Sequence, residues 1–146
     1  MSGSSMTFAY DNGPGPLKKV IVDWISDSAT GAVSGTTAVK VVGRLVKATT
    51  DPAAGGSAPT DNYDITVTDD EGVDVLAACQ GTLADRDTAN TEEQYFLVKD
   101  LAAGTPLAQS IHPAVCSPLG FAVAAAGNSK AGQIILFVEG ELLGNI

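Results

Sequence analysis

The stretch YDITVTDDEGVDVL, residues 63–76, alternates apolar and polar side chains on both sides of an acidic turn. Apolar side chains occupy every second position in YDITV and again in VDV. A period of two is the pattern of a half-buried β-strand, and Gly72 can adopt the positive φ that a short hairpin loop requires. The stretch therefore predicts a β-hairpin with DDEG at its exposed tip.

Strand patterns recur along the rest of the chain. LKKVIVDWI places Val20, Val22 and Trp24 on one face, and Gly43 inside a later strand suggests a bulge. Continuously apolar IILFV should lie centrally or in an interface. A turn followed by a Thr/Val strand is expected in SDSATGAVSGTTAVK (26–40). Further strands are expected in VVGRLVKAT (41–49), QYFLV (94–98), LGFAVAAAG (119–127) and QIILFVEGELL (133–143), the last two as a hairpin. Residues 102–118 are expected to form a long connection, and residues 75–86 hold the best candidate for a short helical turn.

Short strands, Gly/Pro-rich turns and no long helical period favour an all-β fold, an antiparallel β-sandwich of jelly-roll or Ig-like type. We assign residues 17–146 to this single domain and residues 1–16 to an extended N-terminal arm. Met6, Phe8 and Tyr10 alternate within the arm. Two interpretations of the arm stay open: it clamps a neighbouring subunit, or it is the first strand of its own domain.

Composition excludes several classes of function. The net charge is −9 with only eight Lys and Arg, so the basic stripe of a nucleic-acid-binding protein is missing. Cys79 and Cys116 are expected to be small buried residues in a reducing cytosol, without a zinc site, and a single disulfide between them stays open as the alternative. The N-terminus lacks signal-peptide character and no apolar run approaches the ~20 residues that span a bilayer, so we expect cytoplasmic synthesis and no membrane partner.

Catalytic chemistry has no visible basis in the residues. DDEGVD lacks the alternating oxygen ligands of a calcium loop, so its carboxylates fit an exposed turn better than a metal site or an acid/base pair. His112 is the only histidine, and no nucleophile elbow accompanies it. We therefore expect no enzyme, no cofactor and no metal, with His112 in a loop or an interface.

Three segments in order resemble small structural proteins of tailed bacteriophages: LKKVIVDWISDSATGAVSGTT (17–37), APTDNYDITVTDDEGVDVL (58–76) and VAAAGNSKAGQIILFV (123–138). The likeness covers about residues 17–138 and leaves out the arm and the tail EGELLGNI. Proteins of this kind are usually encoded among the virion genes and have no enzymatic activity assigned. The resemblance implies a virion structural protein.

The leading expectation is a capsid decoration (cement) protein that forms homo-oligomers, with a trimer as one arrangement, and binds the major capsid protein or another virion protein. A neck, tail or adsorption-apparatus component is the first alternative. A carbohydrate-binding attachment module is the second, although the few aromatic residues and the core-like position of Trp24 count against it. The candidate interface residues are Met6, Phe8, Tyr10, Leu142 and Leu143.

Overall fold

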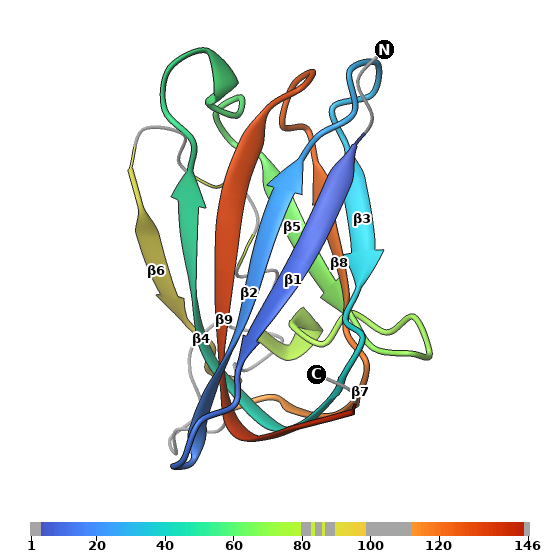
Figure 1. The fold of residues 1–146 in the computed structure, drawn as a ribbon, viewed down its shortest axis with the longest axis vertical. Coiled ribbons are helices and arrows are strands. Elements are labelled where there is room, and N and C mark those ends of the chain that lie inside the picture. Colours follow the sequence, from blue (N-terminus) through green and yellow to red (C-terminus); the bar gives the residue numbers. More distant parts are fainter. Residues whose placement is uncertain (1–3, 80–82, 84–85, 87–89, 99–111, 145–146) are drawn as a thin grey trace.

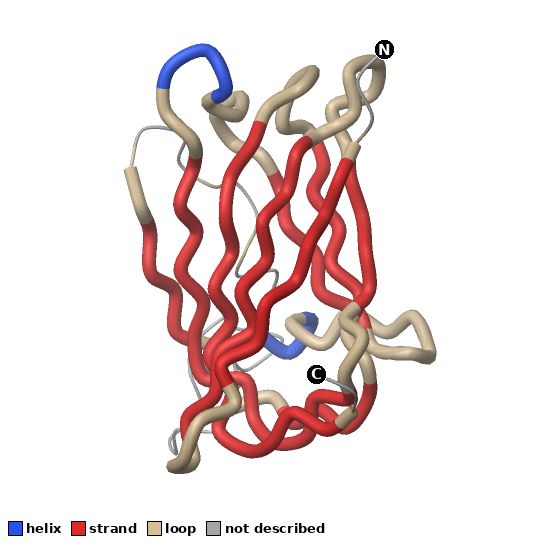
Figure 2. The backbone as a smooth tube through the Cα atoms, viewed as in Figure 1, coloured by secondary structure: helices blue, strands red, loops and turns tan. Residues whose placement is uncertain are grey.

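Two antiparallel β-sheets pack face to face in the computed structural model, which describes residues 4–79, 83, 86, 90–98 and 112–144 (Figure 1). The described residues form nine strands: β1 (Ser5–Asp11), β2 (Leu17–Ile25), β3 (Val33–Thr36), β4 (Lys40–Pro52), β5 (Asp64–Thr68), β6 (Glu92–Tyr95), β7 (Ala114–Ser117), β8 (Gly120–Ala124) and β9 (Ala131–Leu143). Two short 3-10 helices, Gly55–Ser57 and Ala77–Cys79, lie outside the strands (Figure 2). The predicted all-β antiparallel sandwich is confirmed.

The large sheet has the strand order β1-β2-β9-β4-β6, and β7 also pairs with β4. β6 and β7 share one edge of β4, because β7 pairs with residues 41–44 and β6 with residues 47–50. The small sheet has the order β3-β8-β5. Within the described residues all strand pairs are antiparallel, which leaves each sheet with one face toward the core and one face outward.

The core lies between the two sheets and is filled by alternate residues of each strand. The predicted inward face of β2 is confirmed, since Val20 and Val22 are fully buried and Trp24 is 1% exposed. On the neighbouring strand β9, the buried residues are Ile134, Leu136 and Val138. The main core residues from the central strands are Val20, Val22, Trp24, Val41, Leu45, Ala48, Ile134, Leu136 and Val138 of the large sheet, and Ile65, Val67, Phe121 and Val123 of the small sheet.

β9 is the centre of the large sheet, as IILFV predicted, but it does not form a hairpin with β8. β8 belongs to the small sheet, and β9 pairs with β2 and β4 instead. The segment between them crosses from one sheet to the other, and Ser26 fixes it by donating to the carbonyl of Gly127 (2.6 Å) and accepting from the N–H of Lys130 (2.8 Å). The predicted hairpin is wrong because alternating apolar residues identify a strand without identifying its partner.

The acidic turn forms as predicted, but its second strand does not. Gly72 has a φ of +80°, and the Asp69 carboxylate accepts the N–H groups of Glu71 and Val73, both at 2.9 Å. After the turn, pairing is limited to an isolated bridge between Thr68 and residue 74. The chain then enters the short 3-10 helix, so β5 takes β8 as its strand partner.

Gly43 marks a close backbone approach and not a bulge. The register shift of the β4–β9 ladder lies between Leu45 and Lys47. Gly43 pairs with Gly140, and both have positive φ angles, +138° and +155°. The lower ends of β4 and β9 turn across the bottom of the sandwich (Figure 1), and β7 pairs with residues 41–44 of β4.

Two other segments differ from the sequence predictions. The expected connection at residues 102–118 contains strand β7, and its residues 102–111 lie outside the described part of the chain. The strand expected at residues 94–98 begins and ends earlier, as β6, and Phe96 is a buried core residue after its end. An Ala-Val-Cys-Ser strand of four residues is too short to stand out from its Pro-rich surroundings.

Candidate functional site

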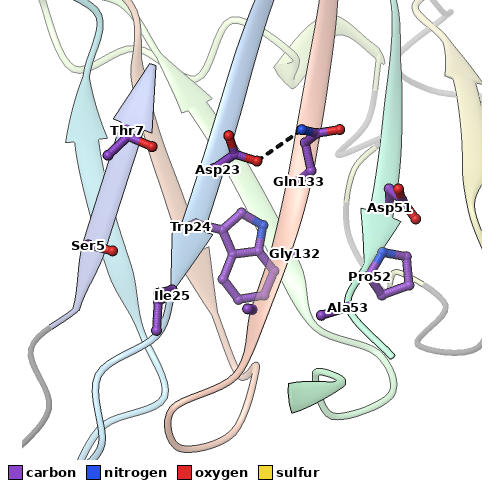
Figure 3. Close-up of a pocket in the computed structure, with 11 residues that line it drawn as sticks. Ser5, Thr7, Asp23, Trp24, Ile25, Asp51, Pro52, Ala53, Gly132 and Gln133 are labelled. Atoms are coloured by element: carbon purple, nitrogen blue, oxygen red, sulfur yellow. Dashed lines mark hydrogen bonds between the residues drawn. The ribbon is translucent and has the colours of Figure 1, made fainter. Parts of the chain in front are cut away.

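The outer face of the large sheet carries a polar groove at the end where β2 finishes and β9 begins. Four outward residues lie in register across four strands, in the order Thr7, Asp23, Gln133 and Asp51. A cavity of about 410 Å³ lies over this row and is lined by Ser5, Thr7, Asp23, Trp24, Ile25, Asp51, Pro52, Ala53, Ala131, Gly132 and Gln133 (Figure 3). We call this site the polar groove.

Two hydrogen bonds fix three of the polar side chains in the groove. Gln133 Nε2 donates to Asp23 Oδ1 at 2.9 Å, and Thr91 Oγ1 donates to Asp51 Oδ1 at 2.9 Å. Figure 3 shows the Gln133 amide with its nitrogen toward Asp23 and its oxygen toward the side of β4. The groove therefore presents carboxylate oxygens on both sides of an oriented amide.

Trp24 belongs to the core beneath the groove. Gly132 is its register partner, and a Cβ added to Gly132 would lie only 2.7 Å from Cζ2 of the indole, so the indole uses the space that a larger residue would fill. The indole also contacts the Tyr63 ring, with 5.6 Å between centroids. Burial raises the pKa of Tyr63 to about 12. The predicted core position of Trp24 is confirmed.

A second feature of the outer face is a row of alternating lysines and aromatic rings. Lys19, Phe137, Lys47 and Tyr95 are consecutive register partners across β2, β9, β4 and β6. The Lys19 ammonium lies 5.5 Å from the Phe137 centroid, and the Lys47 ammonium lies 4.7 Å from the Phe137 centroid and 5.3 Å from that of Tyr95. These are cation–π distances. We call this row the lysine–aromatic band.

The charge of Lys47 in the band is balanced by a neighbouring carboxylate. Lys47 donates to Glu93, and this hydrogen bond is the main reason that the pKa of Lys47 is raised above its usual value. The adjacent row contains Ile21 and Ile135, which are register partners on the same outer face and are only half-buried. The described residues thus leave an apolar strip beside a row of cations and rings.

The five predicted interface residues are mostly used inside the chain. Met6, Phe8 and Tyr10 of β1 pack against the core, with Phe8 and Phe121 ring centroids 5.9 Å apart and the Tyr10 hydroxyl accepting the N–H of residue 38. β1 pairs along its length with β2, so the first-strand interpretation of the arm describes this structure. Leu142 is 2% exposed, whereas Leu143 is 47% exposed and keeps its interface role as a prediction.

The remaining predicted residues lie apart from the outer-face features. His112 Nδ1 is 2.6 Å from the carbonyl oxygen of Phe96. Cys79 is buried as predicted, but Cys116 is exposed on β7, because it faces outward from a strand that the sequence did not reveal. Neither cysteine forms a disulfide within the described residues. Over the described ranges there is no group of three or more His, Cys, Asp or Glu side chains that could hold a metal ion.

Sequence reasoning missed both the polar groove and the lysine–aromatic band. Alternation in LKKVIVDWI did place Lys19 and Asp23 opposite the core face, which was the available signal. The two rows depend on the register of β9 between β2 and β4, and that register is a long-range property.

Comparisons with known proteins leave the functional inference to this geometry. In the part of the chain that is described, no helix is long and apolar enough to cross a membrane. No protein-family model matches the sequence, and a search of curated proteins finds no match.

Proposed function

We propose that this chain is a non-enzymatic structural protein of a tailed-phage virion, and that it acts as a capsid decoration (cement) protein that binds and stabilises the head lattice. The observation that carries the proposal is the outer face of the large sheet, with the lysine–aromatic band beside Ile21 and Ile135. The ordered likeness of three segments to phage structural proteins supports the setting.

The composition of this face suits docking onto a large partner. Half-buried isoleucines and the Phe137 and Tyr95 rings supply apolar contact area. The lysine stems extend this area, and their ammonium groups lie over the rings, where they can pair with acidic groups of a partner. Tyr95 is 52% exposed and is the ring most available for burial against a partner. Such a contact is modest for one copy and becomes strong when many copies bind a repeating lattice.

Charge restricts the docking contact to part of the large sheet. The chain carries a net charge of −9, which disfavours non-specific association between copies. Lys19 and Lys47 lie in the lysine–aromatic band, whereas Asp23 and Asp51 lie on the same outer face near its other end. The band, and not the whole sheet, would thus face the partner.

The first test is the copy number of this chain in purified virions, measured by quantitative mass spectrometry against the major capsid protein. A ratio near one, or a simple fraction of it, is expected for a component that covers the head lattice. A handful of copies per particle would contradict the decoration role and place the chain in the neck, tail or adsorption apparatus.

The second test addresses the docking face. Tyr95→Ala should weaken attachment to particles, whereas Val73→Ala should not, because Val73 is a comparably exposed apolar residue (56%) on the acidic turn. Far-UV circular dichroism checks that both variants fold like the parent. Attachment is measured by co-sedimentation of each protein with heads that lack the decoration protein. Equal attachment of all three proteins would rule out this face.

A further inference from the structure

We infer that the polar groove is a binding site for a neutral, hydroxyl-rich ligand, and specifically for a saccharide. The inference rests on the in-register row Thr7–Asp23–Gln133–Asp51 and on the cavity above it, and it is independent of the virion setting. It assigns a ligand class to a surface that the proposed docking contact does not use.

The hydrogen-bonding groups of the groove match those of a sugar. A sugar hydroxyl donates one hydrogen bond and accepts others, so it needs both acceptors and donors nearby. Asp23 and Asp51 are acceptors, while Thr7 and the Gln133 amide offer donors as well as acceptors. An anionic ligand would be repelled by the two carboxylates, which leaves neutral polyols as the better fit.

The polar groups are held in place before any ligand binds. Gln133 is oriented by its bond to Asp23, and Asp51 is oriented by the bond from Thr91. Sites whose polar groups are pre-oriented lose less conformational entropy on binding. Neighbouring strands are ~4.8 Å apart, so the row of four residues spans about 14 Å, enough for more than one sugar ring.

Small and apolar residues shape the rest of the groove. Ala131, Gly132 and Ala53 keep its floor low, and Ile25, which is 44% exposed, forms an apolar side wall. The C–H faces of sugar rings pack on such surfaces. Since the Trp24 ring is buried below the floor, no indole stacks on the ligand, and we expect binding in the millimolar range.

The groove adjoins the docking face but is formed by other residues. Asp23 of the groove lies four positions along β2 from Lys19 of the lysine–aromatic band, which is about 14 Å at ~3.4 Å per residue. Ile21 of the docking face lies two positions from Asp23, about 7 Å away along the strand. Saccharide binding is therefore measured on the isolated protein, in which no partner covers this face.

The test is an NMR titration of the ¹⁵N-labelled full chain with glucose, galactose, mannose, N-acetylglucosamine and the β-1,4-linked oligomers of N-acetylglucosamine. At least one sugar should shift the amide signals of Ala53, Ala131 and Gly132. Asp51→Asn and Gln133→Ala should weaken that binding about tenfold, as expected when a hydrogen bond to a charged or oriented group is lost. Asp11→Asn is the control, because it removes a carboxylate from β1 outside the groove.

Two outcomes overturn the inference. The first is the absence of localised shifts with every sugar up to 50 mM of ligand (about the weakest affinity that such a site would be expected to show). The second is a response to CaCl₂ or spermidine at the same amides without any response to sugars, since the groove would then be a cation site. Because the assay uses the isolated protein, its failure is distinguishable from a failure of the virion tests.

Discussion

Replacing either glycine of the Gly43–Gly140 pair with alanine should strongly destabilise the protein. A Cβ at Gly43 would lie 2.2 Å from the Glu139 carbonyl oxygen, and one at Gly140 would lie 2.0 Å from that of Val42. Both obstructing atoms belong to the backbone of the partner strand, so no side-chain rotation can relieve the overlap. The φ angles of +138° and +155° add strain of about 1–3 kcal/mol for a residue with a side chain.

Forcing the two backbones apart costs about another 1–3 kcal/mol, as in overpacked cores. We therefore expect each single variant to lose about 4 kcal/mol of unfolding free energy. Urea denaturation followed by the fluorescence of Trp24, the only tryptophan, measures this loss. Gly56→Ala is the control, since nothing lies within 4 Å of its added Cβ and its φ is not positive; its change should stay within about 0.5 kcal/mol. A loss below about 1 kcal/mol in both pair variants would refute the argument.

Three further outcomes follow from single residues. Ala125 has a φ of +60°, so Ala125→Gly should raise the unfolding free energy by about 0.5–1 kcal/mol in urea denaturation, whereas Ala124→Gly, in strand β8, should lower it. The folded pKa of Tyr63 is about 12 against 10.0 for the free side chain, so its contribution to stability is complete below pH 10 and is lost as pH rises toward 12; urea denaturation across this range should show a steeper decline for the parent than for Tyr63→Phe. Cys116 should react with a thiol reagent in the native protein and Cys79 only after unfolding, which is measured by counting modified thiols with and without urea; native labelling of both would contradict the burial of Cys79.

The sequence predicted the parts of the fold that are encoded by local alternation. Val20, Val22 and Trp24 share one face of β2 because a strand places every second side chain on the same side, and no long-range information is needed to see it. The position of Gly72 in the acidic turn was accessible for a similar reason, since a tight turn needs positive φ at a particular residue. These features depend on a few neighbouring residues.

Strand partnership could not be predicted in the same way. β8 and β9 are separated by a short turn-like segment, and the local pattern of such a segment fits a hairpin as well as a crossing between sheets. Gly43 fits a bulge as well as a close approach to Gly140, which lies 97 residues further along the chain. Each error comes from a contact whose second half lies far away in the sequence.

The two candidate sites also depend on contacts between residues that lie far apart in the sequence. Lys19 and Asp23 could be assigned to the outer face of β2 from alternation alone. The lysine–aromatic band and the polar groove exist only because β9 places Phe137 beside Lys19 and Gln133 beside Asp23. Register across three or four strands is therefore what turns scattered polar residues into a site.

The central position of β9 also determines when this protein can fold during its synthesis. β2 and β4 are both complete by Pro52, yet the strand that joins them begins at Ala131. At about 5–20 residues per second, the ribosome needs roughly 4–16 seconds to make the intervening stretch of roughly 80 residues. Throughout that interval the edges of β2 and β4 that β9 will join lack their partner strand, and the net charge of −9 is the property of the chain that opposes aggregation through them.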